Sequence, residues 1–255
     1  GKVPLVGEFF LHADYAALGG LIALEQMPGF NELLAELDGR FVYKTLNNSG
    51  QAKIHALPYK LNTRCLLINR TLAEEANLDP EKPPQDWEEL SVWIEKLGHL
   101  CQKKGAGWHG FACDIPQGWH GVIGYLPFLW ADAAATIDNS LEGFAGLFQN
   151  LATEKWLNTL SHLVAIGQPC LNGDSYLLFN AGRVGLILSG AAWAIKIDQN
   201  VHANFEIICA PLPGWRPECP ARTVAGDFSL GIFSAGARDE TQVAAALFLL
   251  FPFRN

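Results

Sequence analysis

Apolar residues recur at helical spacing in one long stretch of the chain, which begins after Asp86. They lie three or four residues apart, which predicts a helix with one buried face. Asp86 is suited to cap the first turn, with Glu89 three residues later as in a capping box. Gly105 and Gly107 are suited to end the helix. The apolar positions are Trp87, Leu90, Ile94, Leu97 and Cys101.

Short runs rich in aliphatic residues predict strands on both sides of this helix. They cover residues 54–57, 65–69, 111–113, 184–188, 205–209 and 230–233. Further helices are expected over 141–151, from Glu154 onward, and over 240–251. Strands that alternate with helices predict an α/β fold with largely parallel sheets.

The composition is that of a globular protein, because 49% of the 255 residues are hydrophobic and 17% are charged. The net charge of −8 and the absence of any basic run exclude nucleic acid as a partner. No run reaches the roughly 20 apolar residues of a membrane span. No signal peptide is visible at Gly1, as would also be true of a trimmed precursor.

The six cysteines have none of the short C-x-x-C spacings of zinc or redox sites. We expect buried thiols that act as small apolar side chains, with Cys209 and Cys219 as the first pair to check for a disulfide. The cysteines are Cys65, Cys101, Cys113, Cys170, Cys209 and Cys219.

Two further patterns resemble cofactor sites without their context. Gly105, Gly107 and Gly110 spell G-x-G-x-x-G, but they leave a helix and enter a strand, the reverse of a nucleotide-binding turn. A His-rich stretch follows with spacings that match no zinc pattern. We therefore expect no cofactor and no metal at these residues: His99, Cys101, His109, Cys113, Asp114 and His120.

Eight tryptophans are many for this length. Three of them fit the buried faces of predicted helices: Trp87, Trp93 and Trp156. Three others lie beside glycines or at segment ends: Trp119, Trp130 and Trp193. An indole face suits the apolar C–H surface of a sugar ring. The alternative for each of these rings is ordinary packing in the core.

A series of short motifs then points to a known family. They are Leu57-Pro58-Tyr59, Leu67-Ile68-Asn69-Arg70, Ala76-Asn77-Leu78-Asp79-Pro80, Trp87-Glu88-Glu89-Leu90, 179–185, 189–194, 210–214, Ala225-Gly226-Asp227 and Leu230-Gly231-Ile232. In this order they resemble the family-1 extracellular solute-binding proteins of ABC importers, such as those for maltose and glycerol 3-phosphate. Ile68 departs from the family's tyrosine and Ala192 from its proline.

The resemblance implies an α/β, two-lobe periplasmic-binding-protein-like fold (type II). Lobe one would comprise residues 1–58 and 226–255, and lobe two residues 59–225. The fold would be incomplete at both ends. Family members carry a strand–helix–strand unit before the segment that matches Tyr15, and a helical part after the one that matches Phe251.

The same resemblance implies a receptor and not an enzyme. A sugar, polyol or glycerol phosphate would be captured between the lobes by hinge closure and passed to ABC permease subunits. The location would be periplasmic or extracellular, with membrane association through the permease or a lipid anchor not present in this chain. Two alternatives stay open: a small α/β hydrolase or lyase that uses cleft carboxylates or histidines, and a non-transporting solute sensor.

The expected ligand-binding residues come from the motifs and from the strand ends. Trp193 falls where the family's Gly-Pro-Trp places a ring against the ligand. Trp119 and Asp114 follow the strand over 111–113, and open α/β sheets bind ligands at the carboxyl ends of their strands. Asp227 and Gly226 lie in the return segment, and Tyr59 follows the Leu-Pro motif. The set is Trp193, Trp119, Asp114, Asp227, Gly226 and Tyr59.

Overall fold

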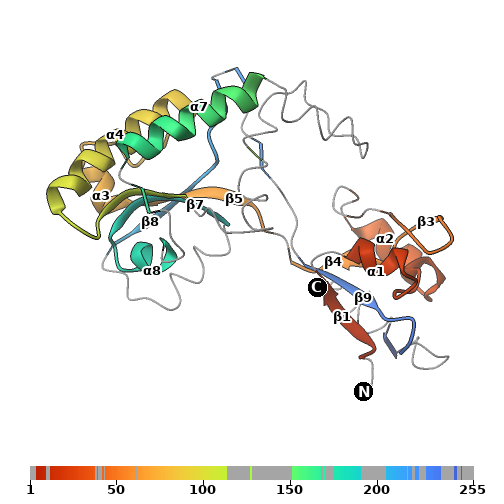
Figure 1. Ribbon diagram of the computed structural model, residues 1–255. Helices are drawn as coiled ribbons and strands as arrows, with labels where there is room; N and C mark the ends of the chain where they lie inside the picture. The colour runs from red at the N-terminus through yellow and green to blue at the C-terminus, as the bar shows by residue number, and fades with distance from the viewer. Residues whose placement is uncertain are drawn as a thin grey trace. The chain divides into compact units, whose positions relative to one another are not determined.

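A computed structural model shows two compact units (Figure 1). The first unit comprises residues 1–61 and 225–255, and the second comprises residues 62–224. The structure describes residues 4–9, 12–37, 39, 42, 44–60, 62–113, 127, 151–167, 169–170, 175–190, 205–216, 218–219, 222–223, 228–236, 244–245 and 248.

The first unit is built around a three-stranded antiparallel sheet in the order β1-β9-β4. Gly231 in the central strand pairs with Gly7 on one side and Ala56 on the other. Side chains of the helical segments and strands meet in one core, which includes Leu24, Phe30, Leu57, Leu230 and Ile232. The elements are β1 (Val6–Phe9), α1 (His12–Ala17), η1 (Leu24–Gln26), α2 (Phe30–Glu36), the hairpin β2 (Thr45–Leu46) and β3 (Ala52–Lys53), β4 (Ala56–Pro58) and β9 (Ser229–Ile232).

The second unit holds a four-stranded mixed sheet in the order β6-β7-β5-β8. Helices α4 and α7 lie together over one face and α8 lies on the other (Figure 1). The apolar strands β5 and β7 are central and buried on both faces, as expected of strands between helical layers. The elements are β5 (Arg64–Asn69), α3 (Arg70–Glu75), α4 (Trp87–Lys104), β6 (His109–Cys113), α7 (Leu151–Ile166), α8 (Ser175–Asn180), β7 (Val184–Gly190) and β8 (Ile207–Ala210).

Helix α4 confirms the periodicity read from the sequence. The Asp86 carboxylate accepts hydrogen bonds from the N–H groups of Glu88 and Glu89, both at 2.9 Å. The Glu89 carboxylate in turn accepts from the N–H of Gln85 at 2.8 Å, one residue outside the expected capping box. The helix ends at Gly105, which has φ 100°. Its buried face packs against α7, where the rings of Trp87 and Trp156 lie 5.0 Å apart.

Glycines allow α4 to approach its neighbours closely. A β-carbon on Gly98 would lie 2.6 Å from the carbonyl oxygen of Ile166 at the end of α7. A β-carbon on Gly185 would lie 2.7 Å from the carbonyl oxygen of Gly110. A β-carbon on Gly110, part of the G-x-G-x-x-G pattern, would lie 2.6 Å from the backbone nitrogen of Gly98, so this glycine serves the packing of β6 against α4. The order helix, glycines, strand is as expected.

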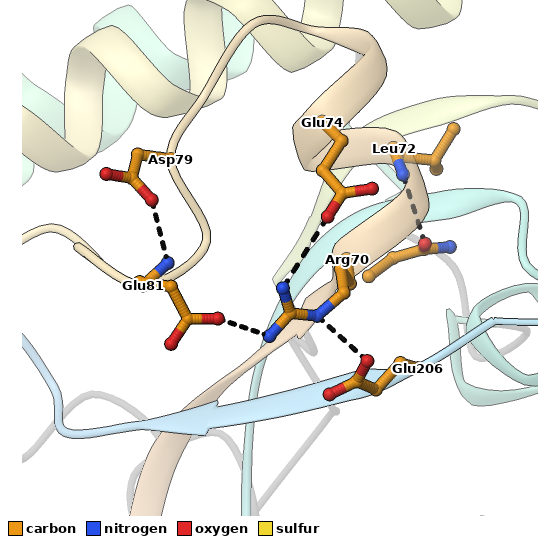
Figure 2. A network of polar contacts seen from close by, with 7 residues as sticks. Arg70, Leu72, Glu74, Asp79, Glu81 and Glu206 are labelled. Atoms are coloured by element: carbon orange, nitrogen blue, oxygen red, sulfur yellow. Dashed lines mark hydrogen bonds and ion pairs between the residues drawn. The ribbon is translucent and has the colours of Figure 1, made fainter.

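An arginine ties three segments of the second unit together (Figure 2). Arg70 follows Asn69, whose side chain caps α3 by accepting from the Leu72 N–H. The guanidinium of Arg70 contacts three carboxylates, at 3.5, 2.6 and 2.9 Å. They belong to α3, to the loop that follows it, and to the segment that enters β8: Glu74, Glu81 and Glu206.

The expectation of largely parallel sheets is wrong. Among the strand pairs of the described residues, only β6 and β7 are parallel. These two are joined by a helical connection, which is the connection that parallel neighbours require. Strand β5 pairs antiparallel with both β7 and β8, which are distant in sequence, and alternation along the chain does not determine such pairs. Most residues of the two helices expected over 141–151 and 240–251 lie outside the described part of the chain.

The cysteines also differ in part from expectation. Cys65, Cys101 and Cys170 are buried, as expected, and burial raises the pKa of the Cys101 thiol to about 11. Cys209 is an exposed free thiol. Its expected neighbour Cys219 instead accepts a hydrogen bond from the Nε of Arg216 at 3.2 Å.

Candidate functional site

The ends of four strands meet at one edge of the second unit's sheet. Parallel strands β6 and β7 end there side by side, because Cys113 pairs with Leu188. Strand β5 begins there, because Arg64 pairs with Gly190 at the end of β7. Strand β8 ends there, because Ala210 pairs with Leu66, two residues into β5. We call the strand ends at Cys113, Gly190, Ala210 and Arg64 the crossing edge.

The chain enters and leaves the second unit at this edge. It enters at Asn62, two residues before β5, and leaves after 224. Thr223 binds the entering segment by three hydrogen bonds. Its Oγ1 lies 2.8 Å from the Oγ1 of Thr63, accepts from the Arg64 N–H at 2.9 Å and donates to the Arg64 carbonyl at 3.0 Å. The two connections between the units are thereby held next to each other where they join the second unit.

Polar side chains line the same edge. A β-carbon on Gly190 would lie 2.7 Å from the side-chain amide nitrogen of Asn62, so a larger residue there would displace this side chain. One residue earlier, the buried Ser189 donates from its hydroxyl to the Tyr176 hydroxyl of α8 at 3.1 Å. Hydroxyl and amide groups of this kind recognise sugars and polyols through hydrogen bonds.

In the first unit, an aromatic and a charged side chain follow the end of β4, just before the chain passes into the second unit. The N–H groups of Tyr59 and Lys60 both donate to the Phe228 carbonyl, at 2.9 and 3.1 Å. The pairing of β4 with β9 thus continues past the strand ends and fixes the backbone of Tyr59. Tyr59 is 41% exposed, so the residue is partly open to solvent.

Lys60 organises this group. Its ammonium lies 4.8 Å from the centre of the Tyr59 ring and 5.2 Å from that of Phe228. It also forms an ion pair with the carboxylate of Glu8 in β1, at 3.1 Å. Lys60 therefore reaches from the end of β4 across β9 to the far strand of the sheet. The group offers an aromatic face, a donor and an acceptor together.

The structure describes one of the six residues expected to bind a ligand, Tyr59. The other five lie outside the described residues: Trp193, Trp119, Asp114, Asp227 and Gly226. Three of them follow described residues of the crossing edge closely in the sequence. Asp114 directly follows β6, Trp193 comes three residues after β7, and Gly226 comes three residues after Thr223.

Sequence reasoning missed the polar residues at the crossing edge and those around Tyr59. Lys60 could have been found, because it directly follows the Tyr59 of the recognised motif. No local signal marks Glu8, which is 52 positions from Lys60, or Thr223, which is 159 positions from Arg64. Such partners become visible only when the strand pairing is known.

The described residues contain neither a candidate metal site nor a candidate membrane span. Within those ranges, no three His, Cys, Asp or Glu side chains converge where a metal ion could bind. The expectation of no metal stays a prediction. No helix in the described part of the chain has the length and apolar character needed to cross a bilayer.

Comparisons with solved structures identify the fold. UgpB from Mycobacterium tuberculosis, in complex with glycerophosphocholine, superposes with a TM-score of 0.75 at 21% identity, over 98% of this chain and 62% of that one. A solute-binding protein of an ABC transporter from Thermotoga lettingae, bound to α-D-tagatose, superposes with a TM-score of 0.71 at 21% identity, over 96% of this chain and 61% of that one. The expected periplasmic-binding-protein-like fold class is confirmed.

Curated relatives agree in sequence. The sn-glycerol-3-phosphate-binding periplasmic protein UgpB of Salmonella paratyphi A is 25% identical over 206 residues, and that of Escherichia coli K12 is 24% identical. These matches cover 76% of this chain and 44% of each relative, so the chain spans less than half of their length. The family model for bacterial extracellular solute-binding proteins matches residues 6–253. The chain therefore belongs to the family of bacterial extracellular solute-binding proteins.

Proposed function

We propose that this chain captures a small polyhydroxylated solute, a sugar, polyol or glycerol phosphate, and presents it to the permease subunits of an ABC importer. Family membership supports the receptor role. Relatives named for sn-glycerol 3-phosphate, and structures of similar proteins bound to glycerophosphocholine and to tagatose, support this class of solute. Binding would favour a closed arrangement of the two units, with the solute between them.

The observation that carries the proposal is the crossing edge. Ligands of open α/β sheets bind at the carboxyl ends of strands, and β6 and β7 end side by side as parallel neighbours. In the sequence, Asp114 directly follows β6 and Trp193 comes three residues after β7. We assign Trp193 to stack on the solute, and Asp114 to accept hydrogen bonds from its hydroxyl groups. Trp119 is the second aromatic candidate, five residues after Asp114.

The segments between the units supply the remaining contacts in this proposal. Gly226 and Asp227 follow Thr223, which is held against the start of β5. On the other connection, Tyr59 presents a partly exposed ring beside the Lys60 ammonium. The ring can stack on a sugar, and the neighbouring ammonium and carboxylate can hydrogen-bond to the sugar's hydroxyls.

The receptor role needs no chemical step, so the solute would be released unchanged. The family is one of extracellular proteins, and we place this chain outside the cytoplasmic membrane, associated with it through the permease or a lipid anchor. A hydrolase or lyase would consume the solute. Binding with no turnover separates the two roles.

A thermal-shift screen tests the proposal. Glycerol 3-phosphate, glycerophosphocholine, tagatose and maltose would each be added to the chain, and each mixture assayed for solute loss. A rise in melting temperature with one of them, and full recovery of that solute, is expected. Tyr59→Ala should reduce the rise, and Leu18→Ala, at a position 84% exposed, should retain it. Consumption of the solute, or no rise with any of the four, would contradict the proposal.

A further inference from the structure

Two cysteines that are far apart in sequence lie on the same face of neighbouring strands. Cys209 in β8 pairs with Leu67 in β5, and Cys65 comes two residues before Leu67. Side chains two apart on a strand point to the same face, so Cys65, Leu67 and Cys209 share the face that carries α8. The core on this face includes Cys65 and Leu67, with Ile207 packed against it.

The two cysteines differ sharply in environment. Cys65 is 4% exposed, and it lies diagonally across from Cys209 on the neighbouring strand. Cys209 is exposed to solvent. Burial, followed by the neighbouring Cys209, raises the pKa of the Cys65 thiol well above its usual range. One member of the pair is therefore open to reagents in solution, and the other is shielded behind it.

We propose that Cys65 and Cys209 form a reversible disulfide that fastens strand β8 to β5. An extracellular protein works in an oxidising compartment, where disulfides form and persist. Diagonal neighbours in an ideal antiparallel ladder are about 7–8 Å apart, and a disulfide prefers Cα atoms about 4.4–6.8 Å apart. Strand β8 is a four-residue edge strand, paired on one side within the described sheet. Forming the bond would require a shift of its backbone along β5 that brings Cys209 nearer Cys65. The strain left in the bond makes it easier to reduce.

The oxidant is a disulfide in solution, such as oxidised glutathione, and the reaction is thiol–disulfide exchange. The Cys209 thiolate attacks one sulfur of that disulfide, forms a mixed disulfide and expels a glutathione thiolate. The Cys65 thiolate then attacks the Cys209 sulfur and expels the second glutathione thiolate. The two protons lost by the cysteines are taken up by the two thiolates released. Because the Cys65 thiolate is scarce, the second step is slower and accelerates as pH rises.

The bond would act on the second unit as a whole. Cys65 lies in the first strand after the entering connection, and Cys209 in the strand that leads to the leaving connection. A link between them closes a loop that contains nearly all of the second unit. Closing so long a loop restricts the unfolded chain, and the melting temperature should rise by roughly 5–15 °C.

The test oxidises the reduced protein with a series of oxidised-to-reduced glutathione ratios. Samples are quenched with an alkylating agent, unfolded, digested and mapped by mass spectrometry. We expect a peptide linking Cys65 to Cys209, preceded at early times by a glutathione adduct on Cys209. Restoring reduced glutathione should remove the link. A lasting adduct on Cys209 with Cys65 fully alkylatable after unfolding, or a link from Cys209 to Cys219 or Cys170, would overturn the proposal.

Two matched serine variants separate the bond from general effects of oxidation. Cys209→Ser changes an exposed side chain and should abolish both the linked peptide and the rise in melting temperature. Cys219→Ser, at a partly buried thiol that contacts Arg216, should retain both. If oxidation raises the melting temperature equally in Cys209→Ser, the bond is not the cause and the inference fails.

Discussion

Gly98 of α4 faces the carbonyl oxygen of Ile166 so closely that an added β-carbon would lie 2.6 Å from it. The oxygen belongs to the backbone at the end of α7 and cannot turn aside. We therefore predict that Gly98→Ala destabilises the second unit by about 1–3 kcal/mol or more, through overpacking. Chemical denaturation measures this change. Gly39→Ala, where no atom of the described residues lies within 4 Å of the added carbon, is the control and should leave stability nearly unchanged.

The N-terminal cap of α4 gives a second prediction. Asp86 accepts hydrogen bonds from two N–H groups that have no partner within the helix. Asp86→Ala should lower the free energy of unfolding by about 1 kcal/mol. Glu95→Ala, at an exposed position in the middle of α4, should change it much less. Equal losses in the two variants, measured by urea unfolding, would show that the cap contributes nothing beyond helix propensity.

A cluster of titratable residues in the first unit makes its stability depend on pH. His12 and His55 are both buried, and the Nδ1 of His55 lies 2.8 Å from the Thr45 hydroxyl. Burial lowers the pKa of His12, and His55 lowers it further. Burial also lowers the pKa of His55, and the nearby Glu25 carboxylate opposes this in part. Both folded-state pKa values therefore lie below the unfolded value of 6.5.

Because folding lowers the pKa of both histidines, acidification favours the unfolded state. Below about pH 6.5 the unfolded chain binds protons that the folded one does not, so stability is full above that pH and falls as pH decreases. We predict a lower melting temperature at pH 5 than at pH 7.5. His55→Gln should reduce the difference, and His162→Gln, at an exposed position of α7, should not. A melting temperature that stays constant or rises on acidification would refute the prediction.

The Arg70 network gives a salt-dependent prediction. The arginine joins α3, the following loop and the entry to β8 through three carboxylates (Figure 2). These carboxylates are exposed, and exposed ion pairs are weak and screened by salt. Arg70→Gln should lower the melting temperature by only a few degrees in dilute buffer, and by less in 1 M salt. A large loss that does not respond to salt would show that packing of the arginine stem dominates.

The sequence predicted the local features of the fold well. Helix α4 and its Asp86 cap follow from residues close in the chain, and so do the apolar strands β5 and β7. The pairing of strands did not follow, because it depends on contacts between distant segments. The antiparallel pairing of β5 with β7 is of this kind. The short helices α3 and α8 also escaped notice, since six residues are too few for a periodic pattern.

In the candidate site, too, the sequence indicated a local motif but not the contacts between distant segments. Tyr59 was found through a motif, and its neighbours in space were not. Glu8 joins Lys60 only because β1 and β4 flank β9. Thr223 meets Arg64 only because the two connections join the second unit at one edge. Cys219, near in sequence, was the first partner to check for Cys209, whereas the sheet register pairs Cys209 with Leu67, two residues from Cys65.

The most direct test of the proposed receptor role is a calorimetric titration of the chain and of Trp193→Ala with the solute that gives the largest thermal shift. A stacking ring lost from a binding site costs on the order of 1–3 kcal/mol. We therefore predict stoichiometric binding by the original chain, roughly tenfold or weaker binding by the variant, and equal melting temperatures without solute. Unchanged affinity in Trp193→Ala together with a melting temperature lower by several degrees would contradict the account, because Trp193 would then serve the core of the second unit and not the solute.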